Sequence, residues 1–307
     1  MAPPLHRTLR LGRPLDLRLT LGPLRRGGRD RCMILAGGEA WRATRTPEGP
    51  VTTHLLVDPA AASVRGRAWG PGASWALDAL PGLVGADDDD SAFEPRHPLI
   101  RELRRRLAGL RIPRSGAVVE ALVPTVLEQK VTGIEATRSY RDMVAAVGEA
   151  APGPAAARLG LMVPPAPPVL AGIPSWSLHR FGVERKRAET VRRVCLHARR
   201  LEEASTMAPA DAGRRMTAVA GIGPWSAAQV ALVALGDPDA VSVGDFHLPH
   251  QVAWALAGKA RGDDDLMLQL LEPWRGQRGR VVRLIVAGGL REPSFGPRQP
   301  LRSWRSW

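Results

Sequence analysis

The chain of 307 residues has little cysteine and few aromatic residues other than tryptophan. Its two cysteines, Cys32 and Cys195, lie far apart and neither has a Cys-x-x-Cys partner. The sequence therefore supports neither a disulfide framework nor a zinc or iron–sulfur site. No stretch reaches about 18 uninterrupted apolar residues, so we expect no signal peptide and no membrane span. These absences fit a protein of the reducing cytoplasm.

The chain also has fewer acidic than basic residues. It contains 30 Asp and Glu and 43 Lys and Arg, which gives a formal net charge of +13. So basic a chain favours a polyanionic partner, most simply nucleic acid. The alternative is a proteome-wide bias toward arginine, because arginine far outnumbers lysine here. Hydrophobic residues make up 44% of the chain, which is ordinary for a globular protein with a real core.

Residues 1–85 differ from the rest of the chain in their short alternating segments and glycine-rich turns. Leu15–Leu21 and Thr52–Val57 have the pattern of half-buried strands, and Arg26–Arg29 has the composition of a turn. These features predict a small N-terminal β-rich domain. The acidic run Asp87–Asp90 that follows is interpreted as a solvated linker.

Residues 86–290 form the second predicted region, in which apolar residues recur at helical spacing from Pro98 onward. Residues 152–169 are rich in Pro and Ala and are interpreted as a connector. The tail 291–307 is basic and is predicted to be disordered. Helices are expected from near Ser115 and at 132–147, 184–203, 208–219, 224–235, 246–258, 263–272 and 277–288.

The most informative segment is the turn Gly221-Ile-Gly223 between two of these expected helices. Glycine permits positive φ and a close approach of the backbone to a ligand, and Pro224 suits the first turn of the second helix. Unpaired amides and the helix dipole at such an N-terminus both favour a phosphate. By itself, however, Gly-x-Gly is a weak signal, and an ordinary turn between helices would also explain it.

In these surroundings the chain resembles the helix–hairpin–helix DNA glycosylases, and among them the monofunctional DNA-3-methyladenine glycosylase II (alkylation-repair) type. The match rests on Val219–Ala227 and on Asp237–Asp245, with weaker matches at Leu127–Val131 and Pro273–Arg275. The resemblance implies a mainly α, two-lobed helical glycosylase fold, preceded by a small N-terminal β-rich (α+β) domain.

The resemblance also implies the parts of a base-excision site. Asp245 matches the catalytic aspartate, Trp225 matches an aromatic wall of the base pocket, and Trp274 matches a second wall. Gln229 stands where the alkylation-repair type can place another pocket aromatic. Other interpretations remain open, because Asp is a favoured helix N-cap and both tryptophans could simply belong to the core.

A second set of residues matches the surface that faces DNA. Lys130 stands where some members insert an apolar wedge into the duplex. The carbonyl groups of a further set match those that bind a monovalent cation, Na or K, and no other cofactor is required. The DNA-facing residues are Gly221, Ile222, Gly223, Gln129 and Lys130. The cation-binding carbonyls are those of Thr217, Val219 and Ile222.

The chemistry that these residues would perform follows from the substrate. An N-glycosidic bond inside a duplex is out of reach, so the nucleotide must be flipped out. An alkylated purine carries positive charge, so an aromatic wall attracts it and it leaves readily. A carboxylate near C1′ then stabilises the developing oxocarbenium ion or orients the attacking water, and the sequence does not choose between these roles.

One absence bears on strand cleavage. Members of the superfamily that also cut the strand carry a nucleophilic Lys two residues after the second hairpin glycine, and here that residue is Trp225. A tryptophan forms no Schiff base, so we expect base excision without lyase activity. We expect a monomer that acts on double-stranded DNA with damaged bases, in the cytoplasm at the nucleoid.

The identity of the substrate base is not decided by the sequence, because of Gln229. An amide that forms a hydrogen bond with a base edge would suit a deaminated or oxidised base as an alternative to an alkylated one. A competing hypothesis from another class is a non-catalytic protein of the same fold that only binds damaged DNA.

Overall fold

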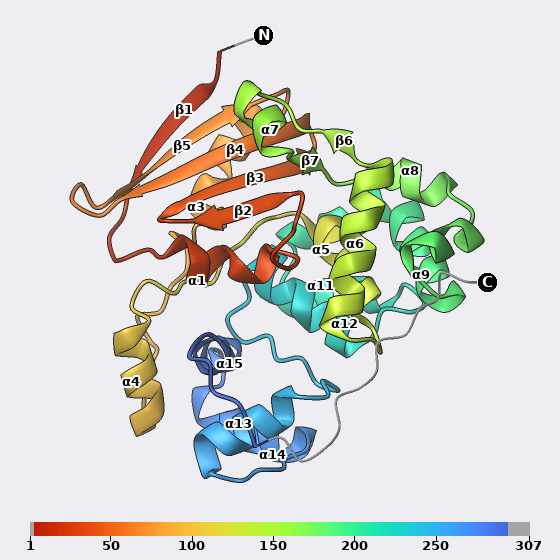
Figure 1. Cartoon of the computed structure of the whole chain (residues 1–307). Helices are drawn as coiled ribbons and strands as arrows, with labels where there is room; N and C mark the ends of the chain where they lie inside the picture. Colours follow the sequence, from red (N-terminus) through yellow and green to blue (C-terminus); the bar gives the residue numbers. More distant parts are fainter. Residues whose placement is uncertain (1–2, 294–307) are drawn as a thin grey trace.

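A computed structural model of the chain describes residues 3–293. Figure 1 shows a sheet at one end of the molecule, a first group of helices beside it and a second, smaller group below. The sheet is five-stranded and antiparallel, in the order β1-β5-β4-β3-β2. Its strands are β1 (Leu5–Arg10), β2 (Met33–Ala36), β3 (Glu39–Thr46), β4 (Gly49–Asp58) and β5 (Ser63–Trp69).

The sheet contains the strand predicted at Thr52–Val57, which lies within β4 and is confirmed. Two short helices, α2 (Ala73–Asp78) and α3 (Leu80–Leu83), follow β5 and pack on one face of the sheet. Gly66 in β5 leaves room for them, because a Cβ there would lie 3.1 Å from the side chains of both Leu77 and Leu80. The N-terminal β-rich region is therefore a sheet with a helical cover on one side.

The strand predicted at Leu15–Leu21 is wrong, because Leu17–Leu21 forms helix α1. Asp16 begins the helix by accepting hydrogen bonds from the amides of Arg18 (2.8 Å) and Leu19 (3.0 Å), as an N-cap residue does. Leu17 and Leu21 are buried one helical turn apart. Leucines at alternate positions are compatible with both a strand and a short helix. Here the Asp16 N-cap favours the helix.

The first helical lobe is built around α5 (Val118–Glu128), which packs against α6 (Gly133–Val147), α9 (Arg185–Leu196) and α12 (Pro224–Val230). Every residue of α5 from Val118 to Leu127 except Glu120 is buried, so α5 is the centre of this lobe. The predicted connector 152–169 contains short elements of its own. The remaining elements are β6 (Glu149–Ala150), α7 (Pro154–Leu159), β7 (Met162–Val163), α8 (Pro167–Gly172), η2 (Ser175–Phe181), α10 (Ala198–Glu202), η3 (Glu203–Thr206), α11 (Pro209–Thr217) and the π-turn η4 (Ala231–Leu235), and η1 (Gly22–Leu24) follows α1.

The second lobe combines an early helix with the end of the described chain. α4 (Pro98–Arg106) packs against α15 (Arg278–Ala287), beside α13 (Leu248–Ala257), α14 (Asp264–Leu271) and the turn η5 (Glu272–Trp274). The predicted helices of this region are confirmed to within two residues at each end. The predicted disorder of the tail concerns mainly residues 294–307, which lie outside the described residues. None of the helices between residues 3 and 293 is long and apolar enough to cross a membrane.

The acidic run Asp87–Asp90 is not a solvated linker throughout, because the side chain of Asp88 is buried and joins the N-terminal region to the second lobe. Its carboxylate pairs with Arg280 of α15 at 2.5 Å, with side-chain exposures of 3% and 0%. It also accepts hydrogen bonds from Arg13 (2.8 Å) and from the amide of Ile112 (3.0 Å). Burial opposes the charged form, but the hydrogen bonds and charge of Arg280 outweigh it and lower the pKa of Asp88. The N-terminal region and the second lobe thus meet at one carboxylate.

Candidate active site and nucleic-acid interface

The glycine turn lies between α11 and α12, as predicted, and its two glycines have different surroundings. Gly221 has φ +99°, and a Cβ there would lie 2.7 Å from Cγ2 of Thr190, so the fold itself requires glycine. Gly223 has extended backbone, and a Cβ there would meet nothing within 4 Å. The fold does not require glycine at 223, and the bare backbone there borders open space.

Three amides of this turn and of the start of α12 lack partners within the described residues. Ile222 is buried, with 5% of its surface exposed, and its N–H donates to the carbonyl of Val219 at 2.9 Å, which anchors the turn. Across residues 3–293, the amides of Gly221, Gly223 and Trp225 donate no hydrogen bond. The structure therefore brings together three free donors where α12 begins, an arrangement that suits an anion.

Gln129 and Lys130 follow α5, and Gln129 contacts the same turn. The Gln129 amide group donates to the carbonyl of Gly221 (3.0 Å) and to Oγ of Ser226 (2.9 Å). Gln129 therefore positions the hairpin from within the protein. Lys130 is exposed and has φ +57°, the left-handed region that a lysine rarely adopts.

Trp225 and Asp245 are joined by a hydrogen bond, from the indole Nε1 to Oδ2 of the carboxylate at 2.8 Å. The other oxygen, Oδ1, accepts from the amides of His247 and Leu248, both at 2.9 Å, at the start of α13. Asp245 thus caps a helix of the second lobe and at the same time contacts α12 of the first. Both side chains are half-buried, so the pair lies at the edge where the lobes meet and remains accessible.

Gln229 and Trp274 are placed differently from one another. Gln229 lies one helical turn beyond Trp225 on α12, is half-buried, and makes no hydrogen bond within the described chain. Trp274 is only 7% exposed, packs in the core of the second lobe, and donates from its indole N–H to the carbonyl of Glu94 at 2.8 Å. Packing and this hydrogen bond account for Trp274 without a bound base.

Phe246 was missed by the sequence reasoning. It follows Asp245 directly and is 79% exposed, with its ring edge-to-face against His247 at 4.9 Å between centroids. A large apolar ring exposed to water beside the Asp245 carboxylate is unusual for a purely structural residue. An aromatic residue between an acid and a histidine, at the start of the predicted helix 246–258, was the available signal.

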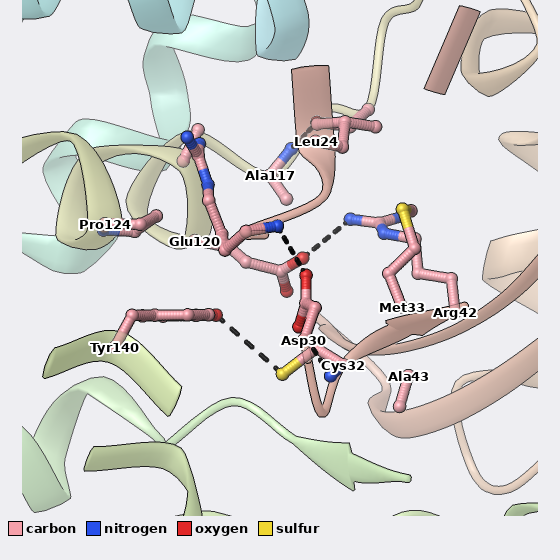
Figure 2. Close-up of a pocket in the computed structure, with 13 residues that line it drawn as sticks. Leu24, Asp30, Cys32, Met33, Arg42, Ala43, Ala117, Glu120, Pro124 and Tyr140 are labelled. Atoms are coloured by element: carbon pink, nitrogen blue, oxygen red, sulfur yellow. Dashed lines mark hydrogen bonds and ion pairs between the residues drawn. The ribbon is translucent and has the colours of Figure 1, made fainter. Parts of the chain in front are cut away.

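A small polar cavity lies between the sheet and helices α5 and α6 (Figure 2). It holds about 20 Å³, space for roughly one water molecule. Its side chains satisfy one another, since Arg42 pairs with Glu120 at 2.8 Å and the Cys32 thiol contacts the Tyr140 hydroxyl at 3.8 Å. Burial raises the pKa of the Cys32 thiol well above its ordinary value, so the thiol is unreactive. This cavity joins the sheet to the helices and is too small for a nucleobase.

No cluster of three or more His, Cys, Asp or Glu side chains that could hold a metal ion occurs in the described part of the chain. The carbonyls of Thr217, Val219 and Ile222 lie on or beside the hairpin turn. The carbonyl of Val219 already accepts one hydrogen bond and keeps a second lone pair. Binding of a monovalent cation there stays a prediction.

The two lobes, the hairpin and the N-terminal sheet form a fold that is shared with solved structures carrying DNA glycosylase names. No protein-family model and no curated protein matches the sequence. Several solved structures match the fold over almost the whole chain. The 3-methyladenine DNA glycosylase from Archaeoglobus fulgidus has a TM-score of 0.77 and 16% identity, and the match covers 91% of this chain and 97% of that one.

Two further matches carry the name MBOgg1 and the name of an 8-oxoguanine glycosylase/lyase. MBOgg1 in complex with a low-affinity DNA ligand has a TM-score of 0.71 and 14% identity, with 91% and 93% of the two chains covered. The Clostridium acetobutylicum 8-oxoguanine glycosylase/lyase, in its apo form, has a TM-score of 0.69 and 11% identity, with 93% and 98% covered. At identities of 11–16%, these likenesses show a shared fold alone, and the activity has to be inferred from the site residues.

Proposed function

We propose that this protein is a monofunctional DNA glycosylase, which flips a damaged base out of the duplex and hydrolyses its N-glycosidic bond. The observation that carries the proposal is the hydrogen bond of 2.8 Å between Trp225 and Asp245, beside the hairpin. It places an aromatic ring and a carboxylate together at the edge where the two lobes meet. Solved structures with this fold carry glycosylase names, which agrees with the proposal.

In this proposal the hairpin binds the DNA backbone. The free amides of Gly221, Gly223 and Trp225 would bind one phosphate, and a Na or K ion on the carbonyls of Thr217, Val219 and Ile222 would add to that contact. Because these groups contact the backbone only, they position the protein without reading sequence. The net charge of +13 draws the protein to duplex DNA in the cytoplasm, where we expect it to act as a monomer.

Asp245 supplies the charge that the reaction needs. Its Oδ1 is committed to two backbone amides, which leaves Oδ2, bonded to Trp225, as the oxygen nearer the first lobe. A fixed carboxylate stabilises an oxocarbenium ion at C1′ or orients the water that attacks it. In both cases, the indole N–H holds the carboxylate in place.

We infer that the substrate is an alkylated purine. Its positive charge suits the face of the Trp225 ring, a contact worth about 0.5–2 kcal/mol, and its good leaving group needs no separate acid. A second candidate is a deaminated or oxidised base, and the observation that favours it is the free amide of Gln229. An amide in the base pocket discriminates for a base edge that bonds to it, because a base without that edge leaves the amide unpaired.

We also infer that the protein does not cut the strand. The chain contains three lysines, Lys130, Lys186 and Lys259, and none stands at position 225. Lys130 directly follows Gln129, which contacts the hairpin, so a borohydride trap with abasic DNA is aimed at Lys130 first. We expect no covalent adduct; an adduct that disappears in Lys130→Ala would show that the protein is a lyase.

Base release from defined duplexes tests the proposed function. Duplexes that carry a methylated purine, hypoxanthine, uracil or 8-oxoguanine are incubated with excess protein, and abasic sites are then cleaved with alkali. Release from the methylated purine is the expected result, and release from another base alone would favour the role of Gln229. Tight binding with no release from any duplex would favour a non-catalytic binder of damaged DNA.

A further inference from the structure

A groove that the proposed site does not use lies between the loop after η1 and helix α6. It has a volume of about 480 Å³ and opens to solvent. In Figure 1 this loop lies in the red segment between α1 and β2, and α6 crosses the middle of the molecule. The groove is lined by Arg26, Gly27, Gly28, Arg29, Ile134, Thr137, Arg138 and Arg141.

The loop side of the groove is held in shape by its own hydrogen bonds. Asp30 accepts from the amides of Arg26 (2.6 Å) and Cys32 (2.7 Å), and Arg25 donates to the carbonyl of Gly28 at 2.9 Å. Gly27 has φ +81°, and a Cβ there would lie 3.1 Å from Cγ2 of Thr137. Glycine therefore lets the loop rest directly on α6, and the groove exists before any ligand binds.

The lining of the groove carries four arginines and no acid. Two of them are neutralised by neighbours, Arg26 by Glu128 at 3.0 Å and Arg141 by Asp142 at 2.8 Å. The other two, Arg29 and Arg138, are exposed and make no ion pair within the described residues. Two free guanidinium groups that face a shared groove are suited to phosphate, which they can bind through paired N–H donors.

The groove is linked to the hairpin through the end of α5. Glu128 pairs with Arg26 at the groove, and the next residue, Gln129, donates to the carbonyl of Gly221 in the hairpin turn. α6 begins just beyond, at Gly133, and carries Ile134, Arg138 and Arg141 on successive turns. Two consecutive residues of one chain segment thus contact the groove and the hairpin turn.

We propose that this groove binds the phosphate backbone of the same DNA, on one side of the base that is removed, through Arg29 and Arg138. The proposal rests on the proposed DNA binding by the hairpin, and it extends the footprint beyond the hairpin and the Trp225–Asp245 pair. Such contacts add affinity that depends on salt and do not depend on base sequence.

The test compares two double variants of the whole protein with the same change in charge. Arg29→Ala/Arg138→Ala removes the free cations of the groove. Arg65→Ala/Arg67→Ala removes two exposed arginines of β5, in the sheet, and serves as the control. Binding to a duplex with a non-cleavable abasic analogue is measured by anisotropy over a range of salt concentrations. Thermal unfolding checks that both variants are folded.

We expect the groove variant to bind at least about tenfold more weakly at low salt, and its slope of log K against log salt to fall by about 2 relative to wild type. The control should stay within about twofold. When the duplex is shortened from each end in turn, the deficit should vanish on one side only.

Equal slopes and affinities for the two double variants would refute DNA binding by the groove, but they would not contradict the proposed glycosylase function. A wild-type protein that fails to bind the duplex at all would overturn both.

Discussion

Asp245→Asn separates the two roles that the structure gives this residue. The carboxylate accepts three hydrogen bonds, from the amides of His247 and Leu248 on Oδ1 and from Trp225 on Oδ2. The oxygen of an asparagine can still accept from both amides, so the cap of α13 survives. The asparagine NH₂ group would then face the Trp225 N–H, a donor against a donor, and that hydrogen bond is lost.

The expected sizes of the two effects differ enough to be told apart. Loss of a hydrogen bond to a charged group costs about 1.5–3 kcal/mol of stability. At about 2–4 °C for each kcal/mol in a chain of this size class, the melting temperature should fall by several degrees. Loss of the negative charge at C1′ should slow base release by about 100-fold or more, while affinity for the duplex is retained.

The assay is single-turnover base release with protein in excess, at a temperature where both proteins are fully folded. Asp263→Asn is the matched control, because Asp263 caps α14 in the same lobe by accepting from the amide of Leu266 at 2.9 Å. It should lower stability by up to about 1 kcal/mol and leave the rate unchanged. If Asp245→Asn stays within about threefold of wild type, or if Asp263→Asn slows release equally, Asp245 is a structural cap and the proposed chemistry fails.

Two further predictions concern the hairpin and the buried junction. Gly221→Ala should destabilise the protein by about 1–3 kcal/mol in urea unfolding, whereas Gly223→Ala should leave stability within about 0.5 kcal/mol and weaken binding to all duplex sequences alike; a sequence-selective loss would contradict backbone recognition. Asp88→Asn leaves Arg280 buried without its partner and should cost about 3–5 kcal/mol. Because the pKa of Asp88 is lowered on folding, its contribution is complete above the ordinary carboxyl pKa of about 4 and is lost as pH falls through the lower folded value. Stability of the wild type should therefore fall more steeply below about pH 4 than that of Asp88→Asn, and parallel curves would show that Asp88 is not the group that titrates.

Helices with a clear apolar period and a marked start were predictable from the sequence. Pro224 begins α12, and the predicted helix 224–235 corresponds to α12 continued by the π-turn η4. The pattern at Leu15–Leu21 failed because leucines two and four residues apart fit either period, and only the Asp16 cap distinguishes them. Local pattern therefore decides an element when several local signals agree.

The sequence singled out candidate site residues, but it did not predict which residues they contact in the fold. Resemblance singled out Trp225 and Asp245, but their hydrogen bond depends on how the lobes pack. Asp88 looked like part of a solvated acidic run, because its partner Arg280 is 192 residues away in the sequence. Trp274 matches a pocket wall by resemblance, but its burial in the second lobe accounts for it equally, so its role in the pocket stays a prediction. Long-range pairings of this kind leave no trace in local spacing.

The junction at Asp88 has a consequence for the order in which the molecule is made. Asp88 and α4 leave the ribosome early, but Arg280 and the rest of α15, against which α4 packs, are synthesised only after the whole first lobe. Until then the second lobe has no complete core, and Asp88 has only Arg13 of its two arginine partners to neutralise it. Helix α13, at whose start Asp245 accepts two backbone hydrogen bonds, also packs against α15. A chain that is still being synthesised therefore has the hairpin before it has the complete second lobe that carries Asp245.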